Sequence, residues 1–545
     1  IDARGVGFAG IDAYVLLGRG RDYAWSATSS GADNVDTFVL RLCDPAGGPA
    51  TTASMGYEHD GHCEPITTFD HTEAVAAIGG GTSGGTLRWT VQRTADYGPV
   101  VRRGTLADGT PIAIARKRST YGDEISSATG FRRLNDPSLM KAGYPAFRTA
   151  TGAHIGFTFN WFYVDGVTIG YEHSCKCPLR ARGVDPDLPV WGTGKWDWKG
   201  YLAPSRQPHD VNPSRGYITS WNNKQAPGFR ASDGQFSYGA VHRVELLNAG
   251  VRRVFAGTEK RGVTRADVVG LMMNAATLDL RAVAVLPRLL AVLAPGTEPA
   301  DLDPRALDLR ERLEIWAGEA TGPHRHGATP GAPYRDPVAI AALDAWWPRA
   351  TSAIFGDGTG APFESLGLTV DDSPRGHGGS AFDDGSYSAV ATDLSVVTGR
   401  PVAGAWARAF CGGGDLTACR TVLWQSLGAT VAALDQQFGS PTVDAWQRAP
   451  ADDEIRFQQV VAGMLPMEWQ NRPTFQQVVQ LRSRGVAGAG STSGGGGGAL
   501  TIVLAGLVGL VVAVLALWWA RRRLGPGFAG GPVPRPARGA PPPSR

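Results

Sequence analysis

Residues 159–173 read FNWFYVDGVTIGYEH, in which two runs of aromatic and β-branched residues stand on either side of Asp165 and Gly166. Such runs are typical of β-strands, and Asp and Gly are typical of the turns between strands. The sequence therefore predicts strands over 157–164 and 167–171. Runs of the same kind make the N-terminal half a predicted sheet, and they occur at 14–42 (AYVLLGRG, DYAWSAT and VDTFVLRL), 87–92 and 112–115.

A different pattern begins at Thr264, where residues 264–267 (TRAD) resemble a helix capping box. Helical sequence continues to about Leu293, and Pro287 is expected to kink or end that helix. No repeat of fixed period is present. The order of strands, then helices, then a return to strand favours one layered α+β body over separate domains. The remaining expected elements are helices over 304–319, 335–355 and 420–437 and a closing strand over 474–481.

The composition supports a packed interior. Of the 545 residues, 43% are hydrophobic and 19% are charged, which excludes wholesale disorder. The formal net charge is +3, but six arginines and no acid follow residue 520, so the first 520 residues hold 47 basic against 50 acidic side chains. Phosphate binding needs a concentrated cationic face. The body is therefore not expected to bind nucleic acid.

The C-terminal part of the sequence has the features of a membrane anchor. Residues 499–520 (ALTIVLAGLVGLVVAVLALWWA) are uncharged and would span about 33 Å as a helix, against a hydrocarbon core of about 30 Å. Two tryptophans end this stretch and three arginines follow, which places that end in the cytoplasm. The expected location is the cell membrane, single-pass, with the body extracellular; a buried core helix is the alternative. The expected parts are a body over 1–485, a Gly/Ser-rich linker over 486–498, a transmembrane helix over 499–520 and a basic, Pro-rich cytoplasmic tail over 521–545.

Six cysteines fit an exported protein. All 15 connectivities are formally open. A zinc site at Cys175, Cys177 and His173 is the rival interpretation of one pair. Proximity in the sequence favours Cys43 with Cys63, Cys175 with Cys177, and Cys411 with Cys419.

Three short motifs match catalytic patterns only in part. Residues 81–85 (GTSGG) match the nucleophile-elbow pattern around Ser83, but the helix-forming sequence that a serine esterase requires does not follow. Residues 192–195 (GTGK) lack the Ser or Thr that a phosphate loop needs after its lysine. Residues 324–326 (HRH) have no acidic or thiol neighbour in the sequence and are expected to be solvated surface. None of the three carries a function by itself.

Two polar clusters are more informative. Residues 33–36 (DNVD) place two carboxylates around a loop that suits a hard cation such as calcium, although an Asp-rich turn explains the same pattern. Residues 221–224 (WNNK) follow an apolar, strand-like run. A buried Asn amide at that position would be a fixed N–H donor for a developing oxyanion, and an ordinary turn is the alternative.

Five segments carry a family resemblance when they are taken together. In chain order they are AWSATSSGADNVDTF (24–38), FNWFYVDGVTIGYEH (159–173), DPDLPVWGTGKWDWKGYL (185–202), GYITSWNNKQAPGFRASD (216–233) and MEWQNRPTFQQVV (467–479). They resemble the β-chain of the penicillin acylase family of N-terminal-nucleophile hydrolases, truncated at its N-terminus. The resemblance implies an αββα four-layer sandwich, here incomplete, within the α+β class and followed by the one transmembrane helix. It also implies an amidohydrolase that acts on linear amides and matures from a zymogen.

The resemblance assigns roles to individual positions. Asn222 matches the oxyanion-hole asparagine, Ser29 matches the residue whose backbone N–H is the second donor, and Arg243 matches the arginine that holds the asparagine. The family also binds one structural calcium ion, and a further acidic ligand is expected from a separate α-chain of the same precursor. The calcium ligands of this chain are expected to be Asp33, Val35 through its carbonyl, Asp36, Pro186 through its carbonyl, and Asp233.

The family's nucleophile is the N-terminal serine of the mature β-chain, whose free α-amino group acts as general base. Ile1 does not match that serine, and no signal segment precedes the body. We therefore expect a fragment that lacks the α-chain and the nucleophile and is inactive alone. Its parent is expected to cleave a small-molecule acyl amide, of the penicillin or acyl-homoserine-lactone type, in antibiotic metabolism or a related process. The alternative is a non-catalytic, acylase-like surface binding protein.

Overall fold

The computed structural model divides the chain into two compact units, Ile1–Arg484 and Gly485–Arg545. Everything described below belongs to the first unit. The boundaries expected from the sequence at 485, 498 and 520 remain predictions. The described residues are 2–7, 14–75, 84–231, 241–258, 262–327, 331–356, 387–454, 467–470 and 477–481.

An antiparallel six-stranded sheet contains the hairpin predicted for residues 159–173. Asp165 forms its turn, since its Oδ1 accepts the N–H groups of Val167 and Thr168 at 2.8 and 2.7 Å. The two hairpin strands, β11 and β12, are neighbours in the sheet, whose order is β1-β2-β3-β11-β12-β14. The strands are β1 (Arg4–Val6), β2 (Leu17–Arg19), β3 (Tyr23–Ser29), β11 (Phe159–Asp165), β12 (Ile169–Ser174) and β14 (His209–Val211).

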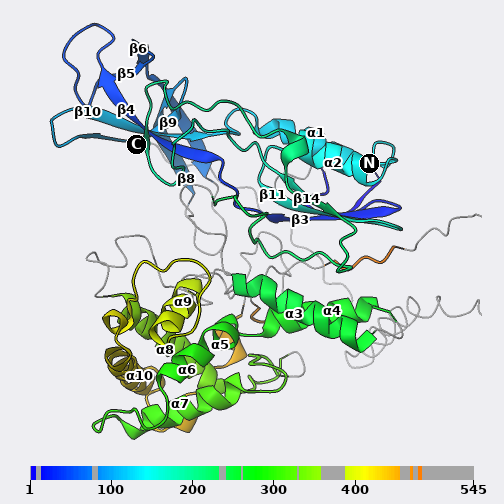
Figure 1. Ribbon diagram of the computed structural model, residues 1–545, viewed down its shortest axis with the longest axis vertical. Coiled ribbons are helices and arrows are strands. Elements are labelled where there is room, and N and C mark those ends of the chain that lie inside the picture. Colours follow the sequence, from blue (N-terminus) through cyan, green and yellow to red (C-terminus); the bar gives the residue numbers. More distant parts are fainter. Residues whose placement is uncertain are drawn as a thin grey trace, which may run out of the picture. The chain divides into compact units, whose positions relative to one another are not determined.

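One face of this sheet is covered by α1 (Ala128–Leu134) and α2 (Tyr144–Arg148), as Figure 1 shows. Trp161 and Tyr163 of β11 point to this face and pack with Leu134 and Phe147 of the helices in one buried cluster. Because side chains alternate along a strand, Asn160 and Phe162 point to the opposite face. The hairpin thus has one face packed against the helices and an opposite face that carries Asn160 and Phe162.

A second sheet has the order β6-β5-β4-β10-β9-β8-β7, and β13 pairs in parallel with β4. Its core contains Phe38, Leu40, Tyr57 and Tyr97, all fully buried. Only residues 30–34 separate β3 of the first sheet from β4 of the second, so this short segment joins the two sheets. The strands are β4 (Val35–Cys43), β5 (Gly56–His59), β6 (His62–Pro65), β7 (Thr67–Val75), β8 (Gly85–Thr94), β9 (Gly98–Thr105), β10 (Pro111–Arg118) and β13 (Val190–Trp191).

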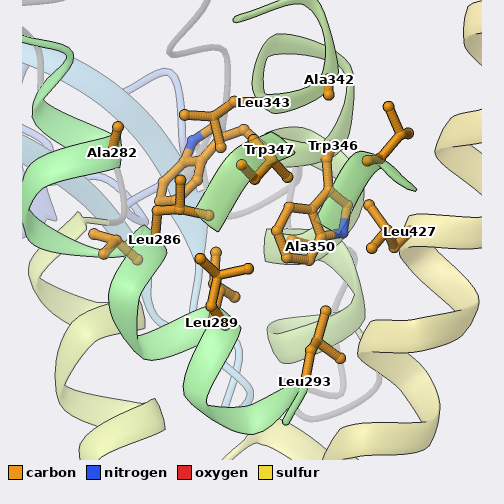
Figure 2. Packing of buried hydrophobic residues seen from close by; sticks show 14 of the residues in the cluster. Ala282, Leu286, Leu289, Leu293, Ala342, Leu343, Trp346, Trp347, Ala350 and Leu427 are labelled. Atoms are coloured by element: carbon orange, nitrogen blue, oxygen red, sulfur yellow. The ribbon is translucent and has the colours of Figure 1, made fainter. Parts of the chain in front are cut away.

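The second half of the chain is helical, and most of its helices share one apolar core (Figure 2). Leu286, Leu289 and Leu343 lie in this core with Trp346 and Trp347, and each is at most 1% exposed. Burial of side chains of this size stabilises a fold by roughly 1.5–3 kcal/mol each. The helices are α3 (Val241–Thr258), α4 (Arg265–Thr277), α5 (Leu280–Ala284), α6 (Leu286–Val292), α7 (Pro304–Ala317), α8 (Pro337–Phe355), α9 (Tyr387–Val397) and α10 (Leu416–Phe438).

The sequence-based helix predictions are largely confirmed. The capping box is present, because Thr264 Oγ1 accepts the Asp267 N–H and the Asp267 carboxylate accepts the Thr264 N–H. Pro287 lies in the first turn of α6, where a missing N–H costs no helical hydrogen bond. The closing strand expected over 474–481 is not confirmed, since 477–481 form no strand and 474–476 lie outside the described residues.

The expectation of a solvated surface at residues 324–326 is wrong. Arg325 is fully buried, and its guanidinium contacts the carboxylates of Asp279, Asp344 and Asp453 at 3.1, 2.9 and 2.6 Å. The two neighbouring guanidinium groups hold the pKa of Asp344 well below its usual range, since Arg325 and Arg281 both contact it. The partners lie 19 to 128 residues away in the sequence, so a local search for acids does not find them.

The transmembrane helix of the expected fold is also corrected. Within the described residues, none of the helices combines the length and the apolar composition that a bilayer crossing requires. The longest, α10, has 23 residues and carries Arg420 and Asp435. The predicted span at 499–520 lies outside the described residues. The described residues thus give no support to the expected transmembrane helix or to the expected single-pass cell-membrane localisation.

The proximity pairing of the cysteines is confirmed. Three disulfides join Cys43 to Cys63, Cys175 to Cys177 and Cys411 to Cys419. The zinc alternative at residues 173–177 is excluded, because thiolate ligands are not available from a disulfide. The nucleophile-elbow candidate Ser83 lies outside the described residues.

Candidate functional site

The site is built around Asn222, in the loop that follows the GYITSW segment. Asn222 has a φ of 61°, a left-handed conformation that non-glycine residues seldom adopt and that Asn tolerates better than most. Its Nδ2 donates to the carbonyl oxygen of Ser29 at 2.9 Å. A second tie holds the loop to the same strand, since Ser220 Oγ and Thr28 Oγ1 are 2.9 Å apart. The unusual backbone is thus fixed against the end of β3.

The peptide of Ser29 faces an edge of the sheet. The next residue, Ser30, donates its N–H to the carbonyl of Thr158 at 3.0 Å. Because bonded and non-bonded pairs alternate in an antiparallel ladder, the N–H and C=O of Ser29 point away from β11. On that side β2 pairs only with Ala24 and Trp25, at the start of β3. Asn222 therefore meets Ser29 at an edge that no described strand covers.

Arg243 fixes the orientation of the Asn222 amide. It lies in the first turn of α3, is 4% exposed, and places its guanidinium 5.7 Å from the ring centre of Trp221. Its Nη2 donates to Asn222 Oδ1 at 3.5 Å. A guanidinium can only donate, so Oδ1 must face Arg243 and the NH2 group must face β3. An amide NH2 has two hydrogens, of which the Ser29 carbonyl uses one. The three expected catalytic positions thus lie together.

A buried polar chain that sequence reasoning missed lies behind Ser29. Ser30 and His173 are fully buried, with Ser30 Oγ 3.1 Å from His173 Nε2, and His173 Nδ1 is 2.8 Å from Gln207 Oε1. Since Gln207 Nε2 donates to the Cys175 carbonyl, its Oε1 accepts from Nδ1–H and the Ser30 hydroxyl donates to Nε2. Burial lowers the pKa of His173 to about 4, so the ring is neutral near pH 7.

This chain positions the peptide next to the site. The carbonyl of Ser30 also accepts from Gln225 Nε2 at 2.9 Å, three residues after Asn222. The Ser30 hydroxyl is closed off from solvent, so Ser30 and His173 cannot act on a substrate as nucleophile and base. Their effect is to hold the Ser29–Ser30 peptide between β11 and the loop. The signals in the sequence were the positions of Ser30, directly after Ser29, and of His173, two residues beyond the strand predicted over 167–171.

Two of the expected calcium ligands, Asp33 and Asp36, share one arginine as a partner. Asp33 and Asp36 are both nearly buried, but Arg180 contacts them at 2.6 and 2.9 Å. Trp198 Nε1 also donates to Asp36 at 2.5 Å. One guanidinium thus neutralises part of the charge that a calcium ion would need from these two carboxylates. No group of three or more potential ligands among the described residues is arranged to hold a metal.

Of the other expected calcium ligands, Val35 and Pro186 are among the described residues and Asp233 is not. Val35 begins β4, and its N–H points to Asp33 Oδ1 at 3.4 Å. Pro186 lies in a turn between Asp185 and Asp187, both of which contact Arg230. Asp233 lies outside the described residues. Calcium remains a prediction that this arrangement does not favour, and no step of the mechanism below passes through it.

Comparison with known proteins decides the family. Residues 1–496 match the penicillin amidase family. The chain belongs to the penicillin amidase family. This membership confirms the resemblance that the five sequence segments carried.

Two kinds of acylase are among the relatives of this member of the penicillin amidase family. It is 30% identical over 306 residues to penicillin G acylase of Escherichia coli, a match that covers 56% of this chain and 32% of that protein. It is 26% identical over 247 residues to acyl-homoserine lactone acylase QuiP of Pseudomonas fluorescens (strain Pf0-1), covering 45% of this chain and 28% of that protein. The matches thus span about a third of the length of these relatives.

A solved structure supports the fold. The thermostable penicillin G acylase from Alcaligenes faecalis superimposes with a TM-score of 0.61 at 19% sequence identity, over 86% of this chain and 80% of that chain. At this identity the likeness speaks for the fold alone. It supports the penicillin acylase-like, N-terminal-nucleophile part of the expected architecture.

Proposed function

We propose that the protein to which this chain belongs is an acylase-type amidohydrolase, and that Asn222, Ser29 and Arg243 form its oxyanion site. The observation that carries the proposal is the left-handed Asn222, whose amide is aimed by Arg243 at the open edge of β3. Family membership and the acylase relatives support the same reaction class.

The chemistry follows from the donors at this edge. When a nucleophile attacks an amide carbonyl, negative charge collects on the carbonyl oxygen, and fixed N–H donors stabilise that charge. The Asn222 NH2 group supplies one donor and the backbone N–H of Ser29 the other. Arg243 is a positioning residue, because it acts through the Oδ1 of Asn222. The fixed amide needs no reorganisation as the charge develops.

The nucleophile is proposed to be an N-terminal serine in a part of the protein that these 545 residues do not supply. Its α-amino group would accept the hydroxyl proton, as the family resemblance implies. The acyl group transfers to the serine oxygen, the C–N bond breaks, and the amine leaves with a proton. Water then releases the carboxylic acid. A separate α-chain is proposed to complete the substrate pocket.

The proposed substrates are linear amides that join an acyl group to a small amine, of the penicillin or acyl-homoserine-lactone type. The similarity of the chain to penicillin G acylase and to acyl-homoserine lactone acylase QuiP supports this substrate class. The test incubates the purified full-length protein with phenylacetyl-p-nitroanilide, penicillin G and an acyl-homoserine lactone, and measures the released amine. Release that is lost in Arg243→Leu supports the proposal. No release from any of the three above the rate of that variant would favour a non-catalytic binding protein.

A further inference from the structure

Two cavities adjoin on the face of the six-stranded sheet opposite α1 and α2. Their volumes are about 640 and 390 Å³. Phe162 of β11 and Ile218, in the segment after β14, line both cavities, so the cavities meet at these two side chains. Phe162 alternates with the helix-facing Trp161 and Tyr163, which fixes the face on which the cavities open.

The larger cavity is mainly apolar and partly open to water, with Arg265 as the one charged residue among its lining residues. Its walls include Val164 of the sheet, Tyr217, and Val268 and Met272 of α4. Val263 and Val268 are 39% and 37% exposed, although both line a concave site. Exposed apolar side chains in a cavity of this size are typical of a site for an apolar ligand group.

The smaller cavity is basic. Lys224 and Arg215 line it, with Asp210 as the one acidic side chain among its lining residues. Arg215 is partly engaged, since its Nη2 is 3.4 Å from Asp210 Oδ2 and its Nε donates to the Tyr217 carbonyl. The Lys224 ammonium forms no ion pair with any residue in the described part of the chain. The cavity thus offers one uncommitted positive charge and one that is shared.

We propose that the joined cavities bind a carboxylate that carries one extended apolar tail. The carboxylate lies at Lys224 and Arg215, where charge-assisted hydrogen bonds are available, and the tail passes Phe162 and Ile218 toward Val268. A neutral amphiphile leaves the ammonium without a partner, and a short carboxylate leaves the apolar walls exposed to water. The site uses neither Asn222, Ser29 nor Arg243, so the inference does not depend on the proposed hydrolysis.

Isothermal titration of the full-length protein with dodecanoate, below its micellar concentration, tests the site. Butyrate is the probe without a tail, and dodecanol is the probe without a charge. We expect one saturable dodecanoate site, with both other probes at least tenfold weaker. We expect Lys224→Gln to weaken dodecanoate binding about tenfold, and Asp210→Asn to strengthen it, because that change removes the repelling carboxylate.

Two further variants locate the tail and control for general charge. Lys141→Gln is the matched control, since Lys141 is exposed and lines neither cavity, and the affinity of this variant should stay within twofold of that of the unchanged protein. Val268→Trp should weaken dodecanoate binding at least tenfold by filling the path of the tail. All four positions are exposed or lie in the cavity lining, and circular dichroism checks that each variant folds. Equal binding of dodecanol and dodecanoate, or unchanged affinity in Lys224→Gln, would overturn the proposal.

Discussion

Asn222 can be replaced in two ways that separate its chemical role from its structural role. Both Asn222→Ala and Asn222→Gly remove the amide donor, and with it the 2.9 Å hydrogen bond to the Ser29 carbonyl. Only alanine must hold its Cβ in the left-handed conformation at φ 61°. Glycine adopts that conformation at no steric cost.

The structure sets the expected sizes of the two effects. Loss of the partly exposed hydrogen bond costs about 1 kcal/mol in either variant. The left-handed backbone adds roughly 1–2 kcal/mol for alanine. The free energy of unfolding should therefore fall by about 1 kcal/mol in Asn222→Gly and by about 2–3 kcal/mol in Asn222→Ala. Loss of an oxyanion donor lowers kcat by about 10²–10³-fold, and that loss should be the same in both variants.

The assay combines urea denaturation with steady-state hydrolysis of a chromogenic acyl amide by the full-length protein. Equal losses of kcat with unequal losses of stability support a donor role. If kcat instead follows stability, so that the glycine variant keeps most of its activity, then Asn222 shapes the loop and does not contribute a donor, and the reasoning fails.

Three more results are expected. Arg325→Met should lower the free energy of unfolding by about 3–5 kcal/mol, because the buried carboxylates of Asp279, Asp344 and Asp453 then share only the guanidinium groups of Arg281 and Arg448. The matched surface change Arg335→Met should cost under about 1 kcal/mol in the same urea titration, and equal costs would contradict a buried network. Burial lowers the pKa of His173 to about 4, so on acidification the unfolded chain takes up a proton before the folded chain does. The free energy of unfolding should therefore have its full value above about pH 6.5 and be about 3 kcal/mol lower at pH 4. Urea melts of His173→Gln should show a smaller pH dependence, and an unchanged pH dependence would refute this. Arg180 already contacts the carboxylates of Asp33 and Asp36, so EDTA should leave the Tm of the unchanged protein as it is, and added calcium should raise the Tm only in Arg180→Ala. A Tm that falls with EDTA in the unchanged protein would instead support a calcium site at these residues.

The parts of the fold that were predictable from the sequence are those set by neighbouring residues. The 159–174 hairpin follows from its apolar runs and Asp165, and the start of α4 follows from Thr264 and Asp267. These features depend on contacts between residues a few positions apart. The same reasoning failed at Arg325, because its nearest acidic partner is 19 residues away and the others are further.

The arrangement of the site could not be predicted from neighbouring residues, because its contacts join residues that are far apart in the sequence. Asn222 meets Ser29 across 193 residues, and Ser30 meets His173 across 143. The family resemblance linked Asn222, Ser29 and Arg243, but it assigned no role to Ser30, His173 or Gln207, although Ser30 and His173 lie within two of its segments. The contact of Arg180 with Asp36, 144 residues away, likewise changed the interpretation of two carboxylates that suggested a cation by themselves.

The most direct measurement is a crystal structure of the full-length protein with phenylboronic acid, whose tetrahedral adduct imitates the charged intermediate. We expect a boronate oxygen about 2.7–3.1 Å from both Asn222 Nδ2 and the backbone nitrogen of Ser29, with Arg243 still in contact with Asn222 Oδ1. A boronate held elsewhere, or with its oxygen contacted by neither group, would contradict the account.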